Sequence, residues 1–117
     1  MKFLCIYKPS KPEGGPHLDP SEMEKMGVFV NEMKAKGILQ ANDGCMPSQF
    51  GARIRLDNGK TSVKDGPFTE SKELIAGFAV IKVASKEEAI EVTKRFLTVA
   101  GDGETEIRQV FERPEGQ

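Results

Sequence analysis

The sequence predicts an α+β fold: a ferredoxin-like (split βαβ) sandwich with an inserted β-hairpin. Strand-like and helix-like stretches follow one another in the order β-α-β, hairpin, β-α-β. Without the hairpin this is the split βαβ order, in which two helices pack on an antiparallel sheet. The 117 residues suit a single domain with its own core. We expect that domain to cover residues 1–113, followed by a disordered tail at 114–117.

The first half begins with an apolar run at residues 3–7, which is typical of a central strand. A loop rich in proline and glycine follows it. Asp19 then caps a helix that has Pro20 in its first turn and Glu22 three residues after the cap. The apolar stripe of this helix, expected to face the core, consists of Met23, Met26, Val30 and Met33. Gly37 ends the helix, and residues 38–41 are a plausible short strand.

The inserted hairpin is predicted by Asn58-Gly59 between two alternating runs, residues 53–57 and 60–64. Asparagine and glycine both tolerate the positive φ that a two-residue hairpin turn requires. Such a turn places Ile54 opposite Val63, which makes one face of the hairpin apolar.

The second half contains the best strand of the chain, residues 77–84. Ser85 and Glu88 then form a capping box at the start of a second helix, whose apolar stripe includes Phe96. Glycines at positions 101 and 103 break that helix, and the alternating residues 106–112 predict a closing strand.

Composition excludes several classes of protein. The 17 basic and 18 acidic residues nearly cancel, so neither nucleic acid nor an anionic membrane is expected as a partner. No apolar run approaches the ~18 residues of a membrane span. Two distant cysteines, Cys5 and Cys45, with one histidine do not make a zinc site, and neither a metal nor an organic cofactor is expected. The first strand begins almost at Met1, so we expect no signal peptide and a cytoplasmic bacterial protein.

Two central strands are apolar on both faces, because residues 3–7 and 78–81 contain few polar side chains. The helices cover only one face of the sheet. In so short a chain a second copy is the simplest cover for the other face, so we expect a homodimer that packs sheet against sheet.

The run from Val63 to Phe78, which contains Asp65-Gly66-Pro67-Phe68, resembles the DGPF (DGPFAETKE) signature of the YCII-related proteins. The helix start at residues 85–89 and the closing residues 106–112 resemble that family too, and the resemblance extends over residues 1–113. It implies a dimeric α+β barrel whose subunits enclose a cleft. Some relatives are associated with sigma factors, and one is a dehydrohalogenase. Others carry a His–Asp pair with the histidine in the first helix, where this chain has none.

Asp65, Glu70 and Lys72 of this motif are the candidate catalytic residues. Asp65 beside a cleft can act as a general base, or it can instead accept backbone hydrogen bonds in a turn. Lys72 between carboxylates can hold a substrate carboxylate or enolate, or the group can be a solvated salt-bridge cluster. The candidate ligand-binding residues, each with a purely structural alternative, are Tyr7, His17, Arg53, Arg55, Phe68 and Glu73.

Two functions follow from these residues. The first is binding or transformation of a small polar molecule in a dimer cleft, by acid–base chemistry of the lyase or isomerase type at the motif. The second is a non-catalytic dimeric module for regulation or protein interaction. The surroundings of Asp65 distinguish the two functions. An enzyme needs the Asp65 carboxylate open to a cleft, whereas a non-catalytic module needs it held by backbone hydrogen bonds.

Overall fold

The computed structural model of the chain describes residues 1–11, 19–68 and 74–113. Its elements are β1 (Lys2–Pro9), α1 (Pro20–Ala35), β2 (Leu39–Gly44), η1 (Ser48–Phe50), β3 (Ala52–Asp57), β4 (Lys60–Asp65), β5 (Gly77–Lys82), α2 (Lys86–Ala100) and β6 (Gly103–Gln109). No helix in these three ranges is both long and apolar enough to cross a membrane.

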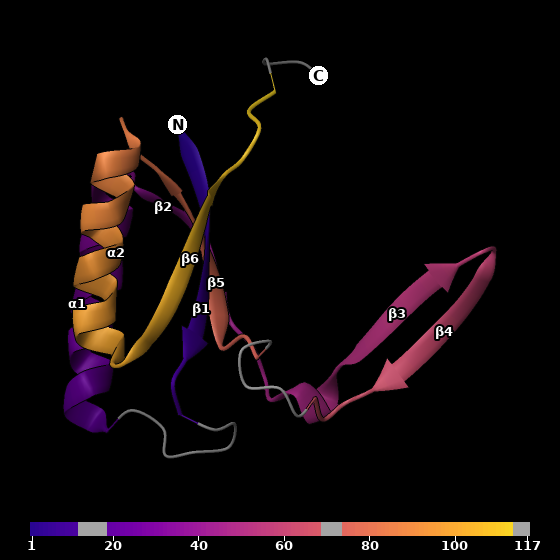
Figure 1. The fold of residues 1–117 in the computed structure, drawn as a ribbon. Helices are drawn as coiled ribbons and strands as arrows, with labels where there is room; N and C mark the ends of the chain where they lie inside the picture. Colours follow the sequence, from indigo (N-terminus) through magenta and orange to yellow (C-terminus); the bar gives the residue numbers. More distant parts are fainter. Residues whose placement is uncertain (12–18, 69–73, 114–117) are drawn as a thin grey trace.

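Four strands form the main sheet in the order β2-β5-β1-β6, and every neighbouring pair is antiparallel. Both helices lie on one face of this sheet, which leaves the opposite face, here called the outer face, without a helix (Figure 1). This strand order and layering confirm the predicted ferredoxin-like subunit.

Both helices begin at the side-chain caps that the sequence predicts. Asp19 Oδ1 accepts a hydrogen bond from the Glu22 backbone N–H at 2.8 Å, and Ser85 Oγ accepts one from Glu88 at 3.1 Å. Each bond satisfies a donor that the first turn of a helix would otherwise leave unpaired. The sequence therefore determines where the two helices start.

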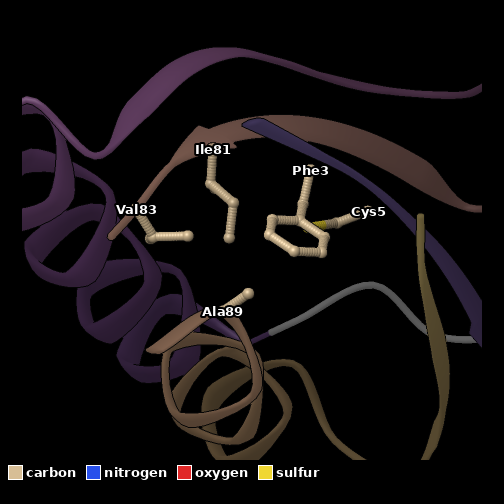
Figure 2. Packing of buried hydrophobic residues seen from close by; sticks show 5 residues of the cluster. All are labelled: Phe3, Cys5, Ile81, Val83 and Ala89. Atoms are coloured by element: carbon tan, nitrogen blue, oxygen red, sulfur yellow. The ribbon is translucent and has the colours of Figure 1, made fainter. Parts of the chain in front are cut away.

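The core lies between the sheet and the two helices, and α1 contributes the buried Phe29 and Met33 to it. The other buried side chains come from β1, from β5 and the residue that follows it, and from α2, and Figure 2 shows them pointing toward one another: Phe3, Cys5, Ile81, Val83 and Ala89. Partly buried Val92 and Ile107 pack against this cluster. The alternation of β1 puts Phe3, Cys5 and Tyr7 on the helix side and Leu4 and Ile6 on the outer face.

The inserted hairpin, β3–β4, forms a separate two-stranded sheet with the predicted register, Ile54 opposite Val63. Its turn residues Asn58 and Gly59 have φ of 50° and 78°, as a two-residue turn of this kind requires. The hairpin projects from the end of the main sheet on the side away from the helices (Figure 1). We call it the arm.

Several boundaries differ from the sequence prediction. The closing strand is Gly103–Gln109 and stops before Phe111, whose side chain is fully exposed. The reason is that its partner β1 begins at Lys2, so no strand remains to pair with residues beyond 110. β2 is longer than expected, whereas β5 ends at Lys82. Met23 of the predicted core stripe is 61% exposed, so it does not belong to the core.

Candidate functional site

A cavity of about 880 Å³ lies between the two helices and the sheet. Its apolar walls come from α1, α2 and the strands, and include Met26, Phe29, Met33, Val92, Phe96, Cys5 and Ile81. Cavities of this size, apolar with a few polar groups, are typical of small-molecule sites. The cavity is therefore the candidate site of this subunit.

Tyr7 lines this cavity. Its hydroxyl donates to the backbone carbonyls of Gly101 and Asp102, each at 3.2 Å, and its ring meets Phe96 edge-on with centroids 5.3 Å apart. Burial, and then the Asp102 carboxylate, raise the Tyr7 pKa. The phenol is therefore a neutral hydrogen-bond donor at this wall.

Three residues of the cavity lining have small polar side chains. Burial raises the pKa of the Cys5 thiol, against a weaker opposing effect of its hydrogen bond with Thr93, so the thiol stays protonated. The Thr93 hydroxyl donates to the Ala89 carbonyl at 2.8 Å. The Thr105 hydroxyl is different: its Oγ1 is buried and has no hydrogen-bond partner in the described part of the chain.

Charged residues gather where α1 begins and α2 ends. The described residues that line this end of the cavity include four carboxylates and one lysine: Asp19, Glu22, Asp43, Asp102 and Lys11. The Glu22 backbone N–H lowers the Asp19 pKa by hydrogen bonding to its carboxylate. An excess of carboxylates in this part of the lining disfavours anions and favours neutral or cationic ligands.

The DGPF motif lies at the base of the arm, packed on the short helix η1. The Gly66 N–H donates to the Gly51 carbonyl at 3.0 Å, and the Phe68 N–H donates to Ser48 Oγ at 2.9 Å. A Cβ at Gly66 would overlap the Ser48 carbonyl, so the backbone approaches here only because residue 66 is glycine. The Arg53 guanidinium stacks 3.8 Å above the Phe68 ring. These contacts form what we call the joint of the arm.

The other predicted site residues do not converge on the cavity as a group. Asp65 is exposed at the end of β4, does not line the cavity, and its carboxylate has no hydrogen-bond or ion-pair partner among the described residues. Arg55 is exposed on the arm. His17, Glu70, Lys72 and Glu73 lie outside the described residues. The backbone that follows the motif, residues 74–76, does line the cavity.

Sequence reasoning missed Thr105 and Asp102, which belong to this cavity. Thr105 stands opposite Tyr7 in the β1–β6 register, and that pairing depends on how two distant segments align. The hydroxyl of a threonine in a polar stretch gives no signal of its own in the sequence. In the described ranges no group of three His, Cys, Asp or Glu side chains is arranged to hold a metal ion.

The fold and cavity define a ferredoxin-like α+β domain with a ligand-sized space between its helix layer and its sheet. Its residues 1–113 match the YCII-related domain, and the chain belongs to that family. An uncharacterized protein of Rhizobium meliloti (strain 1021) is 41% identical over 76 residues, which are 65% of this chain and 61% of that protein. The chain thus spans less than two thirds of that relative.

Among solved structures, a similar fold occurs in 5-chloro-2-hydroxyhydroquinone dehydrochlorinase (TftG) from Burkholderia phenoliruptrix AC1100, in complex with 2,5-dihydroxybenzoquinone. The TM-score is 0.58, and the alignment covers 97% of this chain and 96% of that one. Sequence identity is only 16%, so this likeness concerns the fold.

Proposed function

We propose that the protein binds a small, oxygenated ring compound in the cavity between its helices and its sheet. The observation that carries this proposal is the buried Thr105 hydroxyl, which has no partner among the described residues and belongs to the cavity lining. A buried polar atom without a partner is costly, and a ligand or a water that bonds to it removes that cost. The hydroxyl is shielded from solvent in the empty cavity, so the proposal includes a small shift of the wall that lets a ligand oxygen bond to it.

The chemistry of the walls supports the same class of ligand. The rings of Phe29 and Phe96 and the thioether of Met26 offer apolar contact to a flat molecule. The carboxylates of the cavity lining disfavour an anion. The structurally similar dehydrochlorinase is described in complex with 2,5-dihydroxybenzoquinone, which is a small, flat ring compound with oxygen substituents. We therefore expect a neutral phenol or hydroquinone to bind better than a carboxylate such as benzoate.

Binding can be tested by titrating hydroquinone, phenol and benzoate into the wild type, Thr105→Val and Thr98→Val. Valine keeps the shape of threonine and removes its hydroxyl, and Thr98 is an exposed control on α2. We expect Thr105→Val to bind hydroquinone about tenfold more weakly, since one hydrogen bond is lost, while Thr98→Val binds like the wild type. Equal affinity of all three proteins, or no binding of any probe, would refute the proposal.

A chemical role for the motif is a separate proposal, in which Asp65, with Glu70 or Lys72, performs acid–base chemistry on a small polar molecule in a dimer cleft. Asp65 is exposed, and residues 74–76, just after the motif, line the cavity. Asp65→Asn keeps the size of the side chain and removes its basicity. Product formation lost in Asp65→Asn with binding retained would support this role.

We also propose that the protein is a homodimer whose outer sheet faces meet. Leu4, Ile6, Phe78 and Val80 lie on that face; Phe78 is exposed, and the other three are only partly buried within one chain. A second sheet packed on them would remove this apolar surface from water. The arm, which also has an uncovered apolar face, is the observation that favours an assembly role beside ligand binding.

A further inference from the structure

The arm exposes an apolar face that nothing in its own subunit covers. Ile54, Leu56 and Val63 are 69%, 70% and 65% exposed, and they lie on one face of the hairpin. Two strands alone are marginally stable in water, and a contiguous apolar surface usually marks a contact with another molecule. The arm therefore needs a partner surface.

The joint holds the arm in its projecting position. The Gly66 N–H donates to the Gly51 carbonyl just outside the first pair of the hairpin, and the Phe68 N–H donates to Ser48 Oγ. Arg53 packs its guanidinium on the Phe68 ring, which links the arm to the segment that leaves it. Three different contacts at one point fix the direction in which the strands emerge. The DGPF residues are therefore the structural base of the arm.

The shape of the subunit shows how far the arm reaches. The radius of gyration is 16.3 Å, whereas a compact domain of this length has roughly 13 Å. The arm emerges on the same side as the outer face of the main sheet (Figure 1). A sheet stacked on that face would lie about 10 Å away, and the six-residue strands of the arm extend about 20 Å. The arm is thus longer than the distance between two stacked sheets, so it would extend alongside the second copy.

Charge favours a second copy as the molecule beside the arm. The arm has four basic residues, Arg53, Arg55, Lys60 and Lys64, against two acidic ones, Asp57 and Asp65. The whole chain has a net charge of −1, so the remainder of each subunit is net negative. We call the rest of the chain, outside the arm, the body. In a symmetric dimer the cationic arm of each copy would contact the acidic body of the other, and the opposite charges attract.

We propose that the β3–β4 arm is an exchange arm, which packs the face formed by Ile54, Leu56 and Val63 on the body of a second copy of this chain. This proposal rests on the homodimer proposed above and adds to it a second area of contact. The DGPF motif then serves assembly, because its contacts with η1 aim the arm at the partner.

The test compares Val63→Lys with Ser62→Lys by sedimentation over a dilution series, with circular dichroism to confirm folding. Both residues are exposed neighbours in β4 and point to opposite faces of the arm, so the two variants add the same charge to the same strand. We expect Val63→Lys to weaken dimerisation at least about tenfold and Ser62→Lys less than about threefold.

Three results would overturn the proposal. Dimerisation of Val63→Lys at wild-type strength would refute the arm contact and leave the sheet-to-sheet dimer standing. Equal weakening of dimerisation by both variants would show that the apolar face of the arm makes no specific contact with the second copy. A wild type that stays monomeric at every concentration would refute both the arm contact and the homodimer, but not ligand binding at Thr105.

A second measurement needs no variant. Trypsin cuts after lysine and arginine, and the arm contains four such residues, so cleavage there reports whether the arm is covered. We expect arm cleavage of the wild type to become at least about tenfold faster when the protein is diluted through its dimer–monomer transition. A cleavage rate in the arm that does not change across that transition would count against the exchange arm.

Discussion

Gly66 shows how a single residue determines the arrangement at the joint. Any side chain larger than hydrogen would meet the Ser48 carbonyl, which belongs to the backbone and has little freedom to move. The adjacent Phe68 N–H and the Gly66 N–H are both hydrogen-bonded to the segment around η1. The close approach thus supports two hydrogen bonds, and both depend on the absence of a Cβ.

We predict that Gly66→Ala lowers the free energy of unfolding by about 1–3 kcal/mol, because the added methyl forces two backbone segments apart. Gly51→Ala is the matched control: it lies in the same joint, and its Cβ would be 3.6 Å from the Ser48 carbonyl oxygen, an ordinary contact. Urea denaturation of both variants and the wild type measures the difference. If Gly66→Ala were as stable as Gly51→Ala, the described packing of the joint would be wrong.

Local signals identified some site residues and not others. Tyr7 ends an apolar strand and was a candidate ligand-binding residue of a dimer cleft, and the structure places it in the lining of the cavity between the helices and the sheet. Thr105 could not be predicted, because its burial follows from the register between β1 and β6. Asp65 is an obvious polar residue of a conspicuous motif, yet its exposure follows from the direction of the arm, which no short stretch of sequence specifies.

At the scale of elements, the two helices are joined by Glu32 of α1 and Arg95 of α2. Arg95 Nη1 and Nη2 donate to the two Glu32 carboxylate oxygens at 2.6 and 3.1 Å, and Lys36 donates to the same carboxylate at 3.2 Å. The Arg95 guanidinium also lies 5.3 Å from the Phe29 ring. A bidentate salt bridge of this kind fixes the relative orientation of the two side chains better than a single contact between charges.

The pair also predicts a dependence of stability on pH. Hydrogen bonds from Arg95, and then from Lys36, lower the Glu32 pKa from its usual 4.5 to about 2 in the folded protein. A carboxyl with a lower pKa in the folded state adds stability at pH values above its unfolded pKa, and this stability disappears as the pH falls toward the folded value. The contribution should therefore be complete above about pH 5 and decline between about pH 4.5 and pH 2.

We predict that Glu32→Gln lowers the melting temperature at pH 7 and that its difference from the wild type shrinks between about pH 4.5 and pH 2. Because the pair is exposed to solvent, the effect should be small and should weaken in high salt. Glu24→Gln, an exposed carboxylate of the same helix, is the control. A difference for Glu32→Gln that is independent of pH would exclude the ion pair as its cause.

Helix starts were the most predictable elements, because Asp19 and Ser85 act within one turn of the backbone they cap. The end of β6 was less predictable. Its alternation continues past Gln109, but pairing stops where β1 begins. The hairpin register followed from Asn58-Gly59, while the separation of the hairpin from the main sheet did not. Local chemistry thus predicted elements, and distant pairing decided their extent.

At the scale of the whole molecule, the outer sheet face and the arm both have apolar residues that their own chain leaves uncovered, so the protein should gain stability from association. If folding and dimerisation are linked, dilution favours dissociation and lowers the melting temperature. For a dimer of two 117-residue chains, raising the concentration from about 1 µM to about 100 µM should increase the melting temperature by about 5–8 °C.

Scanning calorimetry at several concentrations measures this shift, and Ile6→Lys provides the contrast. Ile6 lies on the outer face opposite Phe78, away from the cavity, so a lysine there puts a charge where the second sheet would pack. We expect this variant to melt at a lower temperature that hardly changes with concentration. A wild-type melting temperature constant over the whole range would mean that the outer face stays in water, and that its apolar residues have some purpose other than dimerisation.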